Sequence, residues 1–457
     1  MTISTVNPNT GVMVREFTAH TPADVHRALD TAHAAAASWR REPVARRIAV
    51  LTRLAELLDR DRESLATLAT GEMGKTVQSA RDEVAKCAAA CRHYATHAPA
   101  MIAPESQVID GASATLHYDP LGVLLAVMPW NFPFWQVVRA AAPAIAAGNV
   151  VLLKHASNVP QCALALDAIF AEAGAPTGVF QTLLVESSRV AALIADARVA
   201  CVTITGSEAA GRDVAAHAGR ALKKTVLELG GSDPCVVLAD ADLPAAVAAA
   251  IRSRMINNGQ SCIAAKRFIV VDDVADEFER RMIDGVRALR VGDPMLASTD
   301  VGPLATAQIR NEVADQVARA VAGGAHLACG GHTPEGAGWF YAPTVLVRVP
   351  DDSPALTEEI FGPVAPIVRA RNVDDALARA NATPFGLGAS VWTTSAALAE
   401  RAATEIDAGM VFINSIVASD PRFPFGGVKA SGYGREVGVL GLREFVNIKT
   451  VRGSAKE

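Results

Sequence analysis

The sequence predicts an α/β protein built on doubly wound, mostly parallel sheets, and two observations carry this prediction. Short, continuously apolar runs recur from about residue 122 onward, and alanine-rich segments of helical length separate most of them. Strands that are apolar on both faces and alternate with helices are typical of a parallel sheet covered on both sides. The chain has 457 residues, too many for one ordinary hydrophobic core, so we expect two or more domains.

The expected elements follow one another from the N-terminus. Thr21-Pro22-Ala23-Asp24 is a helix start, with Thr21 as N-cap, Pro22 in the first turn and an acid at the third position. A second helix runs from Pro43, because apolar residues recur there at helical spacing. The expected strands of a first series lie at 122–128, 149–153, 179–185, 199–205, 225–229 and 234–239, and those of a second series at 268–271, 345–349, 365–369, 387–392 and 410–414.

Composition and charge exclude several classes of protein. The net charge is −5 and no basic block occurs, so we expect neither nucleic acid nor an anionic membrane as a partner. The first residues lack the basic and apolar regions of a secretory signal, and the most apolar stretch, 140–153, is too short and interrupted to span a bilayer. Seven scattered cysteines indicate no disulfide framework and fit a reducing cytoplasm. No set of residues has metal-ligand spacing.

Polar residues follow three expected strands, at the carboxyl ends where parallel sheets bind ligands. Asn131, framed by two prolines, could present its amide N–H to an oxyanion, although by itself an ordinary turn explains it better. Lys154 suits a ribose or phosphate, or is a solvated lysine. Gly206 and Ser207 open a helix whose backbone N–H groups could meet an anion, but they do not form the GxGxxG fingerprint.

Three more segments carry reactive or recognition side chains. Glu228 interrupts an apolar strand before two glycines, where burial would raise its pKa toward that of a general base; a structural ion pair is the alternative. Cys262 follows small and polar residues, and a helix beginning there would lower the pKa of its thiol; a buried structural cysteine is the alternative. Glu359 and Phe361 offer a carboxylate for ribose hydroxyls and a ring for packing, or else form a capped helix end.

The order and spacing of these segments make the chain resemble the aldehyde dehydrogenase superfamily over essentially its full length. The matching blocks are PWNFP, KHAS, TGSEAAG, LELGG, GQSC, EEIFGPV and PFGGVKASGYGRE. The resemblance implies that Cys262 is the nucleophile, that Glu228 activates the deacylating water, and that Asn131 and the backbone N–H of Cys262 form the oxyanion hole. The cofactor contacts that it implies are Trp130, Asn131, Lys154, Ser157, Gly206, Ser207, Leu229, Glu359 and Phe361.

These roles imply oxidation of a small aldehyde to an acid. The Cys262 thiolate adds to the aldehyde, a hydride goes to the nicotinamide, and water activated by Glu228 hydrolyses the remaining thioester. Dehydrogenation of another small aldehyde is the nearest alternative. A CoA-acylating enzyme would usually lack the base, a thiol esterase would leave the cofactor blocks idle, and a non-catalytic protein is at odds with intact Cys262, Glu228 and Asn131.

Ser157 predicts NADP in preference to NAD as the cofactor. Many NAD-preferring members of the superfamily carry Glu at this position, where its charge would repel a 2′-phosphate. Ser157 removes that charge and leaves Lys154 free to meet the phosphate.

The run from Asn414 to Lys449 resembles a bacterial succinate-semialdehyde dehydrogenase branch of the superfamily. A semialdehyde carries a distal carboxylate, so its pocket needs a cation. Arg139, Ser419 and Arg422 are the expected substrate contacts, with a surface salt bridge as the alternative for each arginine. Ile256 stands where some of these enzymes have a second arginine, so their carboxylate clamp cannot be transferred whole.

The resemblance also implies a domain division and an assembly. Residues 1–101 and 121–229 would form a Rossmann-like cofactor domain, 230–430 an α/β catalytic domain, and 102–120 with 431–457 a small β oligomerisation arm. Within the arm, 445–451 could pair as an edge strand with another subunit. A homodimer or homotetramer is expected.

Overall fold

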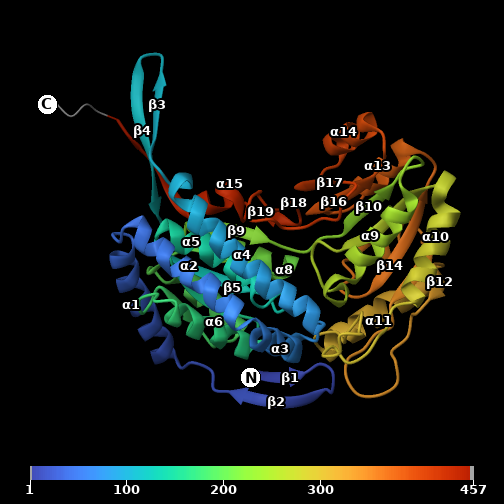
Figure 1. Ribbon diagram of the computed structural model, residues 1–457, viewed down its shortest axis with the longest axis horizontal. Coiled ribbons are helices and arrows are strands. Elements are labelled where there is room, and N and C mark those ends of the chain that lie inside the picture. Colours follow the sequence, from blue (N-terminus) through green and yellow to red (C-terminus); the bar gives the residue numbers. More distant parts are fainter. Residues whose placement is uncertain (1–2, 453–457) are drawn as a thin grey trace.

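Two parallel sheets with helices packed against them form the body of the molecule, and a computed structural model describes residues 3–452 (Figure 1). The first sheet has the order β19-β9-β8-β5-β6-β7, and the second has the order β12-β13-β14-β11-β10-β16-β17. Each sheet is parallel except for one antiparallel edge strand, β19 in the first and β12 in the second. The predicted doubly wound α/β class is confirmed.

Most of the apolar runs form strands that are buried on both faces, whereas three strands at the sheet edges, β12, β17 and β19, are partly exposed. In the first sheet these are β5 (Val123–Met128), β6 (Val150–His155), β7 (Phe180–Thr182), β8 (Val199–Thr205), β9 (Lys224–Glu228) and the short β19 (Gly432–Tyr433). In the second they are β10 (Asp233–Val237), β11 (Ala265–Val271), β12 (His326–Cys329), β13 (Thr344–Val347), β14 (Val364–Ala370), β16 (Gly388–Trp392) and β17 (Met410–Ile413).

Helices flank both sheets. Around the first sheet lie α1 (Pro22–Trp39), α2 (Val44–Arg60), α3 (Arg62–Met73), α4 (Val77–Met101), α5 (Trp135–Ala147), α6 (Pro160–Glu172), α7 (Val190–Ala195) and α8 (Glu208–Arg220). The remaining helices are α9 (Leu243–Met255), α10 (Asp272–Arg287), α11 (Ala307–Ala322), α12 (Pro354–Thr357), α13 (Val373–Asn381), α14 (Ala396–Glu405) and α15 (Gly438–Arg443). The predicted start of α1 is confirmed, since Thr21 and Asp24 form a reciprocal capping box.

The chain passes from one sheet to the other between β9 and β10, and this crossing positions the site. Glu228 ends β9, and Asp233 begins β10 in the other sheet. After β17 the chain returns, and β19 pairs with β9 so that Gly432 faces Glu228. The connection also contains β18 (Val428–Lys429), which pairs with β15 (Phe385–Gly386). The loop before β18 is thereby brought over the end of β9.

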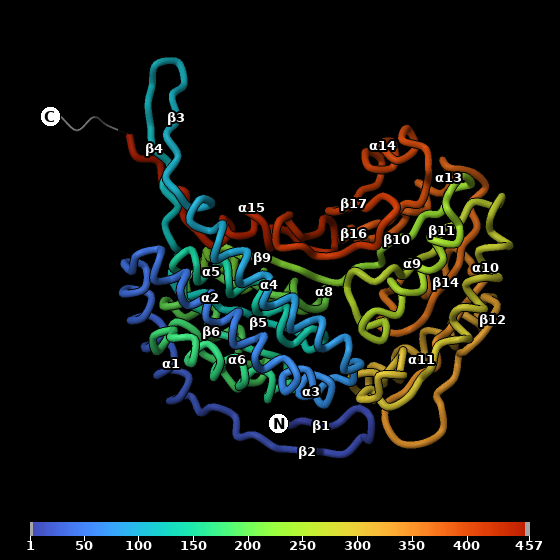
Figure 2. The backbone as a smooth tube through the Cα atoms, viewed as in Figure 1, coloured from blue at the N-terminus to red at the C-terminus, as the bar shows by residue number. Residues whose placement is uncertain are grey.

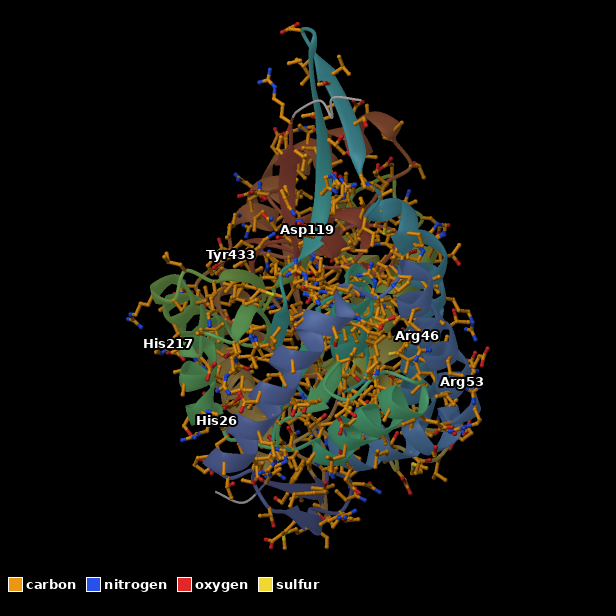
Figure 3. The ribbon with its side chains drawn as sticks, turned by 90° about the vertical axis from the view of Figure 1, so that its left-hand side faces the viewer. His26, Arg46, Arg53, Asp119, His217 and Tyr433 are labelled. Carbon is orange, nitrogen blue, oxygen red and sulfur yellow. The ribbon has the colours of Figure 1, made fainter. Side chains whose placement is uncertain are left out.

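A three-stranded sheet projects from the body (Figures 2 and 3). Its order is β20 (Val446–Val451), β4 (Ala112–Pro120) and β3 (Glu105–Ile109), all antiparallel. One edge of the expected strand 445–451 therefore pairs within its own chain, whereas contact of the other edge with a second subunit stays a prediction. Residues 1–2 and 453–457 of the expected domains lie outside the described residues.

A separate hairpin, β1 (Ile3–Asn7) with β2 (Val12–Phe17), lies along the opposite side of the body (Figure 1). Within residues 3–452, no helix is long and apolar enough to cross a membrane.

Candidate active site

A rigid loop holds Cys262 between the short helical turn η2 (Ile256–Gly259) and strand β11. Asn257 and Asn258 have φ of 56° and 58°, a left-handed conformation that Asn tolerates better than most residues. The Asn257 amide donates to the carbonyl of Gln260 at 2.9 Å and to that of Asn131 at 2.7 Å. The loop is thereby tied to the segment that follows β5.

The condition under which the thiol pKa would be lowered, a helix that begins at Cys262, is not met. A turn and then β11 follow the thiol, so no helix N-terminus stabilises a thiolate there. Burial instead raises the pKa of the Cys262 thiol to about 11, while the positive charges of Arg139 and Lys266 act in the opposite direction. The free protein therefore holds Cys262 mainly as a neutral thiol at neutral pH.

Cys262 lies in the wall shared by two cavities. The first, of about 270 Å³, lies between the two sheets, and α11 closes part of it. The structure brings seven of the predicted cofactor residues together in its lining: Trp130, Asn131, Gly206, Ser207, Leu229, Glu359 and Phe361. The second, of about 570 Å³, lies beside α4 and α5 on the other side of the thiol.

Lys154 and Ser157, which were also predicted to bind the cofactor, are not among the residues lining either cavity at Cys262. Lys154 pairs in register with Val127, so it lies next to the end of β5. Burial lowers the pKa of Lys154, and its ammonium has no hydrogen-bond partner within residues 3–452. Ser157 is exposed three residues farther on. A buried ammonium without a partner in the described residues, on a strand of the same sheet as the strand that leads into α8, fits a phosphate-bearing cofactor.

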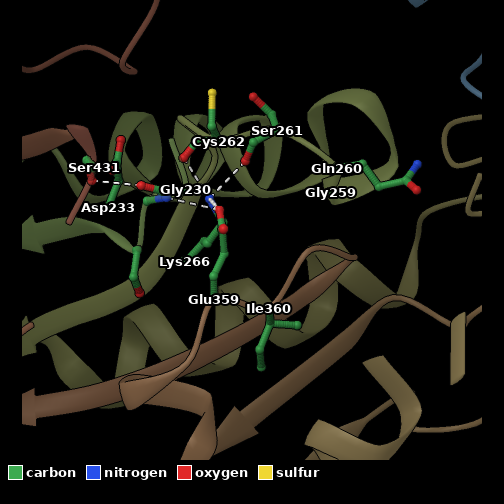
Figure 4. A network of polar contacts seen from close by, with 12 residues as sticks. Gly230, Asp233, Gly259, Gln260, Ser261, Cys262, Lys266, Glu359, Ile360 and Ser431 are labelled. Atoms are coloured by element: carbon green, nitrogen blue, oxygen red, sulfur yellow. Dashed lines mark hydrogen bonds and ion pairs between the residues drawn. The ribbon is translucent and has the colours of Figure 1, made fainter. Parts of the chain in front are cut away.

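Lys266 links the Cys262 loop to Glu359, an interaction that sequence reasoning missed (Figure 4). Its ammonium donates to the carbonyls of Cys262 at 2.7 Å and Ser261 at 2.9 Å, and pairs with Glu359 at 3.2 Å. Glu359 also accepts from the N–H of Gly231 at 3.1 Å. Figure 4 shows the thiol of Cys262 pointing away from this network. The network fixes the backbone and leaves the sulfur directed elsewhere.

Two aromatic rings lie edge to face in the first cavity. Trp130 and Phe361 are 5.7 Å apart between centroids, at an interplanar angle of 90°. Both line the cavity that contains Cys262. An edge-to-face pair leaves one ring face available to a flat ligand.

Glu228 is buried at the end of β9, and neither carboxylate oxygen has a hydrogen-bond partner in the described part of the chain. Burial raises its pKa well above the usual range; Arg139 opposes this shift and the carboxylate of Glu436 adds to it. A Cβ at Gly426 would lie 2.7 Å from Glu228 Oε1. Glycine at this position is therefore what leaves room for the carboxylate, which can accept a proton from water.

Asn131 lines the first cavity beside Cys262. Its amide nitrogen donates to the Gln260 carbonyl at 3.2 Å, which orients the side chain and leaves one N–H available. That N–H can stabilise an oxyanion formed at the sulfur.

The three predicted substrate residues have different surroundings. Arg139 lines the second cavity, but its buried guanidinium pairs with Glu436 and donates to Thr205 at 3.2 Å. Ser419 also lines this cavity. Arg422 does not, and its exposed guanidinium pairs with Asp420 at 2.5 Å. The surface salt bridge that was the alternative for Arg422 is thus present.

Comparisons with known proteins agree over the whole chain. The model of the aldehyde dehydrogenase family matches residues 1–451. The chain is 54% identical over 454 residues to succinate-semialdehyde dehydrogenase (NADP+) 1 of Mycobacterium tuberculosis, covering 99% of each chain. It is 51% identical over 454 residues to succinate-semialdehyde dehydrogenase (NADP+) of Mycobacterium leprae, again covering 99% of each. Among solved structures, succinic semialdehyde dehydrogenase from Streptococcus pyogenes in complex with NADP+ superposes with a TM-score of 0.97 at 37% identity, covering 99% of this chain and 100% of that one.

Proposed function

This chain belongs to the aldehyde dehydrogenase family, and we propose that it oxidises succinate semialdehyde to succinate with NADP. The position of the Cys262 thiol between two cavities carries the proposal. A dehydrogenase needs its nucleophile within reach of both the cofactor and the aldehyde, which enter separately. The relatives named for succinate semialdehyde and NADP support this choice of substrate and cofactor.

The reaction begins at the sulfur. The Cys262 thiol releases its proton to solvent, and its sulfur adds to the aldehyde carbon, forming a tetrahedral thiohemiacetal. The amide of Asn131 and the backbone N–H of Cys262 donate to the resulting oxyanion. The nicotinamide of NADP, which Glu359 and Phe361 would help to hold in the first cavity, would supply the hydride acceptor needed to turn this adduct into a thioester. Glu228 then takes a proton from water, whose oxygen attacks the thioester carbon. The acid is released, and Glu228 returns the proton to the sulfur of Cys262.

The residues that would hold the cofactor surround the first cavity and its approach. The N-terminus of α8 at Gly206 and Ser207 would face the pyrophosphate, and Lys154 with Ser157 would face the adenosine ribose and its 2′-phosphate. Glu359 would accept from the other ribose, beside the ring of Phe361. The lack of an acid at Ser157 is what favours NADP over NAD.

Steady-state kinetics test the proposal. Oxidation of succinate semialdehyde and of uncharged butanal is measured with NADP and with NAD, with Cys262→Ala as the blank. The highest kcat/KM for succinate semialdehyde with NADP supports the proposal. Equal kcat/KM for butanal would indicate an aldehyde dehydrogenase with a different substrate. Hydrolysis of an activated ester, with no oxidation of either aldehyde, would favour a thiol esterase.

We further propose that the enzyme is a cytoplasmic homodimer or homotetramer assembled through the β3–β4–β20 sheet. Val108 and Ile109 on this sheet are 73% and 65% exposed, an unusual exposure for large apolar side chains on a projecting strand pair. Light scattering on the purified protein tests the assembly, with Val108→Asp and Ile109→Asp expected to release subunits. Fractionation of the producing cells tests the location.

A further inference from the structure

The carbonyl of Ser261 and the N–H of Cys262 belong to one peptide unit, and Lys266 holds that unit from one side (Figure 4). The Lys266 ammonium donates to the Ser261 carbonyl at 2.9 Å and to the Cys262 carbonyl at 2.7 Å. The N–H of Ala264 donates to the same Ser261 carbonyl at 3.2 Å. Two donors therefore fix the direction in which this carbonyl points.

The direction of the carbonyl decides the direction of the N–H. The carbonyl and the N–H of a trans peptide lie in one plane and point in opposite directions, and the peptide between Ser261 and Cys262 is trans. The N–H of Cys262 therefore points away from Lys266, as the thiol of Cys262 also does (Figure 4). Within residues 3–452 this N–H donates to no acceptor. It remains available to an oxyanion that forms at the sulfur.

Lys266 acts on this peptide with a charge as well as with a hydrogen bond. The residue is buried, and its ammonium pairs with Glu359 at 3.2 Å. A cation that donates to a carbonyl oxygen draws electron density along the peptide, which makes the N–H of the same unit a stronger donor. The effect is larger in a buried site, because little water screens the charge. Lys266 therefore both orients and polarises the N–H of Cys262.

Other side chains hold the preceding peptide of the loop. Asn131 and Asn257 donate to the carbonyl of Gln260 at 3.2 Å and 2.9 Å. In the part of the chain that the structure describes, the ammonium of Lys266 is the one side-chain donor to the carbonyl of Ser261. Loss of Lys266 would therefore leave the loop held at Gln260, while the peptide that carries the N–H of the nucleophile would lose its side-chain donor.

We propose that Lys266 is a positioning residue of the oxyanion hole: it orients and polarises the peptide whose N–H, together with the amide of Asn131, stabilises the oxyanion at Cys262. The inference rests on the proposed function in taking Cys262 as the nucleophile, but it does not depend on which aldehyde or cofactor the enzyme uses. Lys266 itself does not contact the reacting atoms. Its loss should slow the reactions of the sulfur that form an oxyanion more than those that do not.

Two reactions of Cys262 separate these effects, and neither needs a cofactor or an aldehyde. In both, the thiol first releases its proton to solvent. With para-nitrophenyl acetate, the thiolate adds to the ester carbonyl and forms an oxyanion, whose collapse expels nitrophenolate and leaves an acetyl thioester. With iodoacetamide, the thiolate displaces iodide and no oxyanion forms. Because both rates depend on the thiolate, the ratio of acylation to alkylation reports the oxyanion hole separately from the acidity of the thiol.

Variants of Lys266 are compared by this ratio, with acylation followed as a burst of nitrophenolate and alkylation of Cys262 by mass spectrometry. Lys266→Met removes the charge and the hydrogen bonds to both carbonyls, and it is expected to lower the ratio about tenfold. Asn131→Ala, which removes a donor outright, should lower the ratio roughly a hundredfold. Lys266→Arg keeps a charged donor and should restore the ratio to within about threefold of the wild type.

Lys223→Met is the matched control. The Lys223 ammonium also donates to two backbone carbonyls, those of Ile194 and Asp196, and none of these residues lines either cavity at Cys262. The ratio in Lys223→Met should stay within about threefold of the wild type. Thermal unfolding shows which variants are folded, and Lys266→Gln, which keeps a polar side chain, replaces Lys266→Met if the latter does not fold.

Equal losses of acylation and alkylation in Lys266→Met would overturn the inference, because Lys266 would then act on the thiol alone. An unchanged ratio, or the same fall in Lys223→Met, would also overturn it. A wild-type Cys262 that the ester does not acylate would remove the oxyanion hole and the inference with it. A wild-type enzyme that shows the expected ratios but does not oxidise succinate semialdehyde would overturn the proposed function alone and leave the role of Lys266 in place.

Discussion

Loss of Arg139 is expected to destabilise the fold before it affects substrate choice. Arg139→Met leaves the buried carboxylate of Glu436 without its counter-ion and removes the hydrogen bond to Thr205. Breaking a buried pair from one side typically costs about 3–5 kcal/mol of unfolding free energy. Taking about 2.1 cal/mol/K of unfolding entropy per residue over 457 residues, that loss lowers the thermal midpoint by roughly 3–5 °C.

The double variant Arg139→Met with Glu436→Gln distinguishes a structural pair from a substrate contact. Removing both charges leaves no unpaired ion, so the double variant should recover roughly 2 kcal/mol or more relative to Arg139→Met alone. Calorimetry and urea unfolding measure this recovery. The ratio of kcat/KM between succinate semialdehyde and butanal should meanwhile stay within about threefold of the wild type.

The pH dependence of Arg139→Met follows from the direction of the Glu436 shift. Burial raises the pKa of Glu436, and Arg139 opposes that shift, so without Arg139 the folded-state pKa rises further above its unfolded value. The variant is then most stable when Glu436 is protonated and loses stability as pH rises through the folded pKa. Its deficit should widen from pH 5 to pH 8. Additive single-variant effects, a deficit that narrows with pH, or a collapse of substrate preference in the double variant would each refute this account of Arg139.

Four further outcomes are expected. Because the pKa of the Cys262 thiol is raised to about 11, its alkylation rate without ligands should rise about tenfold per pH unit from 7 to 9; a plateau below pH 8 would contradict this. Gly426→Ala places a Cβ 2.7 Å from Glu228 Oε1, so turnover should fall roughly a hundredfold while a pre-steady-state burst of reduced cofactor remains; a lost burst would locate the defect elsewhere. Asn131→Ala should lower kcat by roughly a hundredfold or more, measured against the wild type at saturating substrate. A higher KM with an unchanged kcat would argue against an oxyanion role for Asn131. Ser157→Glu should lower kcat/KM with NADP by at least about tenfold and leave kcat/KM with NAD nearly unchanged. Equal losses with both cofactors would show that residue 157 does not contact the 2′-phosphate.

Much of the fold could be predicted from the sequence because its signals are local. Strands that are buried on both faces of a parallel sheet are apolar at nearly every position. The apolar runs at 123–128 and 199–205 could therefore be predicted as strands from the sequence alone. The helix start at Thr21 is equally local, since the capping box lies within four residues. The edge strand β19 gave no such signal, because two residues between glycines have no pattern of their own.

The sequence by itself also determined the family and the candidate reactive residues. Cys262, Glu228 and Asn131 each lie in a short block of fixed residue types, and those blocks occur in the order that the family shares. The tertiary structure decided how these groups are charged. It placed β11 rather than a helix after Cys262, so burial raises the pKa of the thiol.

Only the tertiary structure decided which cations are free. It paired Arg139 with Glu436, and it left Lys86 on α4 beside Ser419 with no ion-pair partner among residues 3–452. The physical reason is that burial and pairing depend on segments far apart in the chain, which the fold alone brings together. The chemical type of a residue is known from the sequence, whereas its counter-ion and its solvent exposure depend on the residues that the fold places around it.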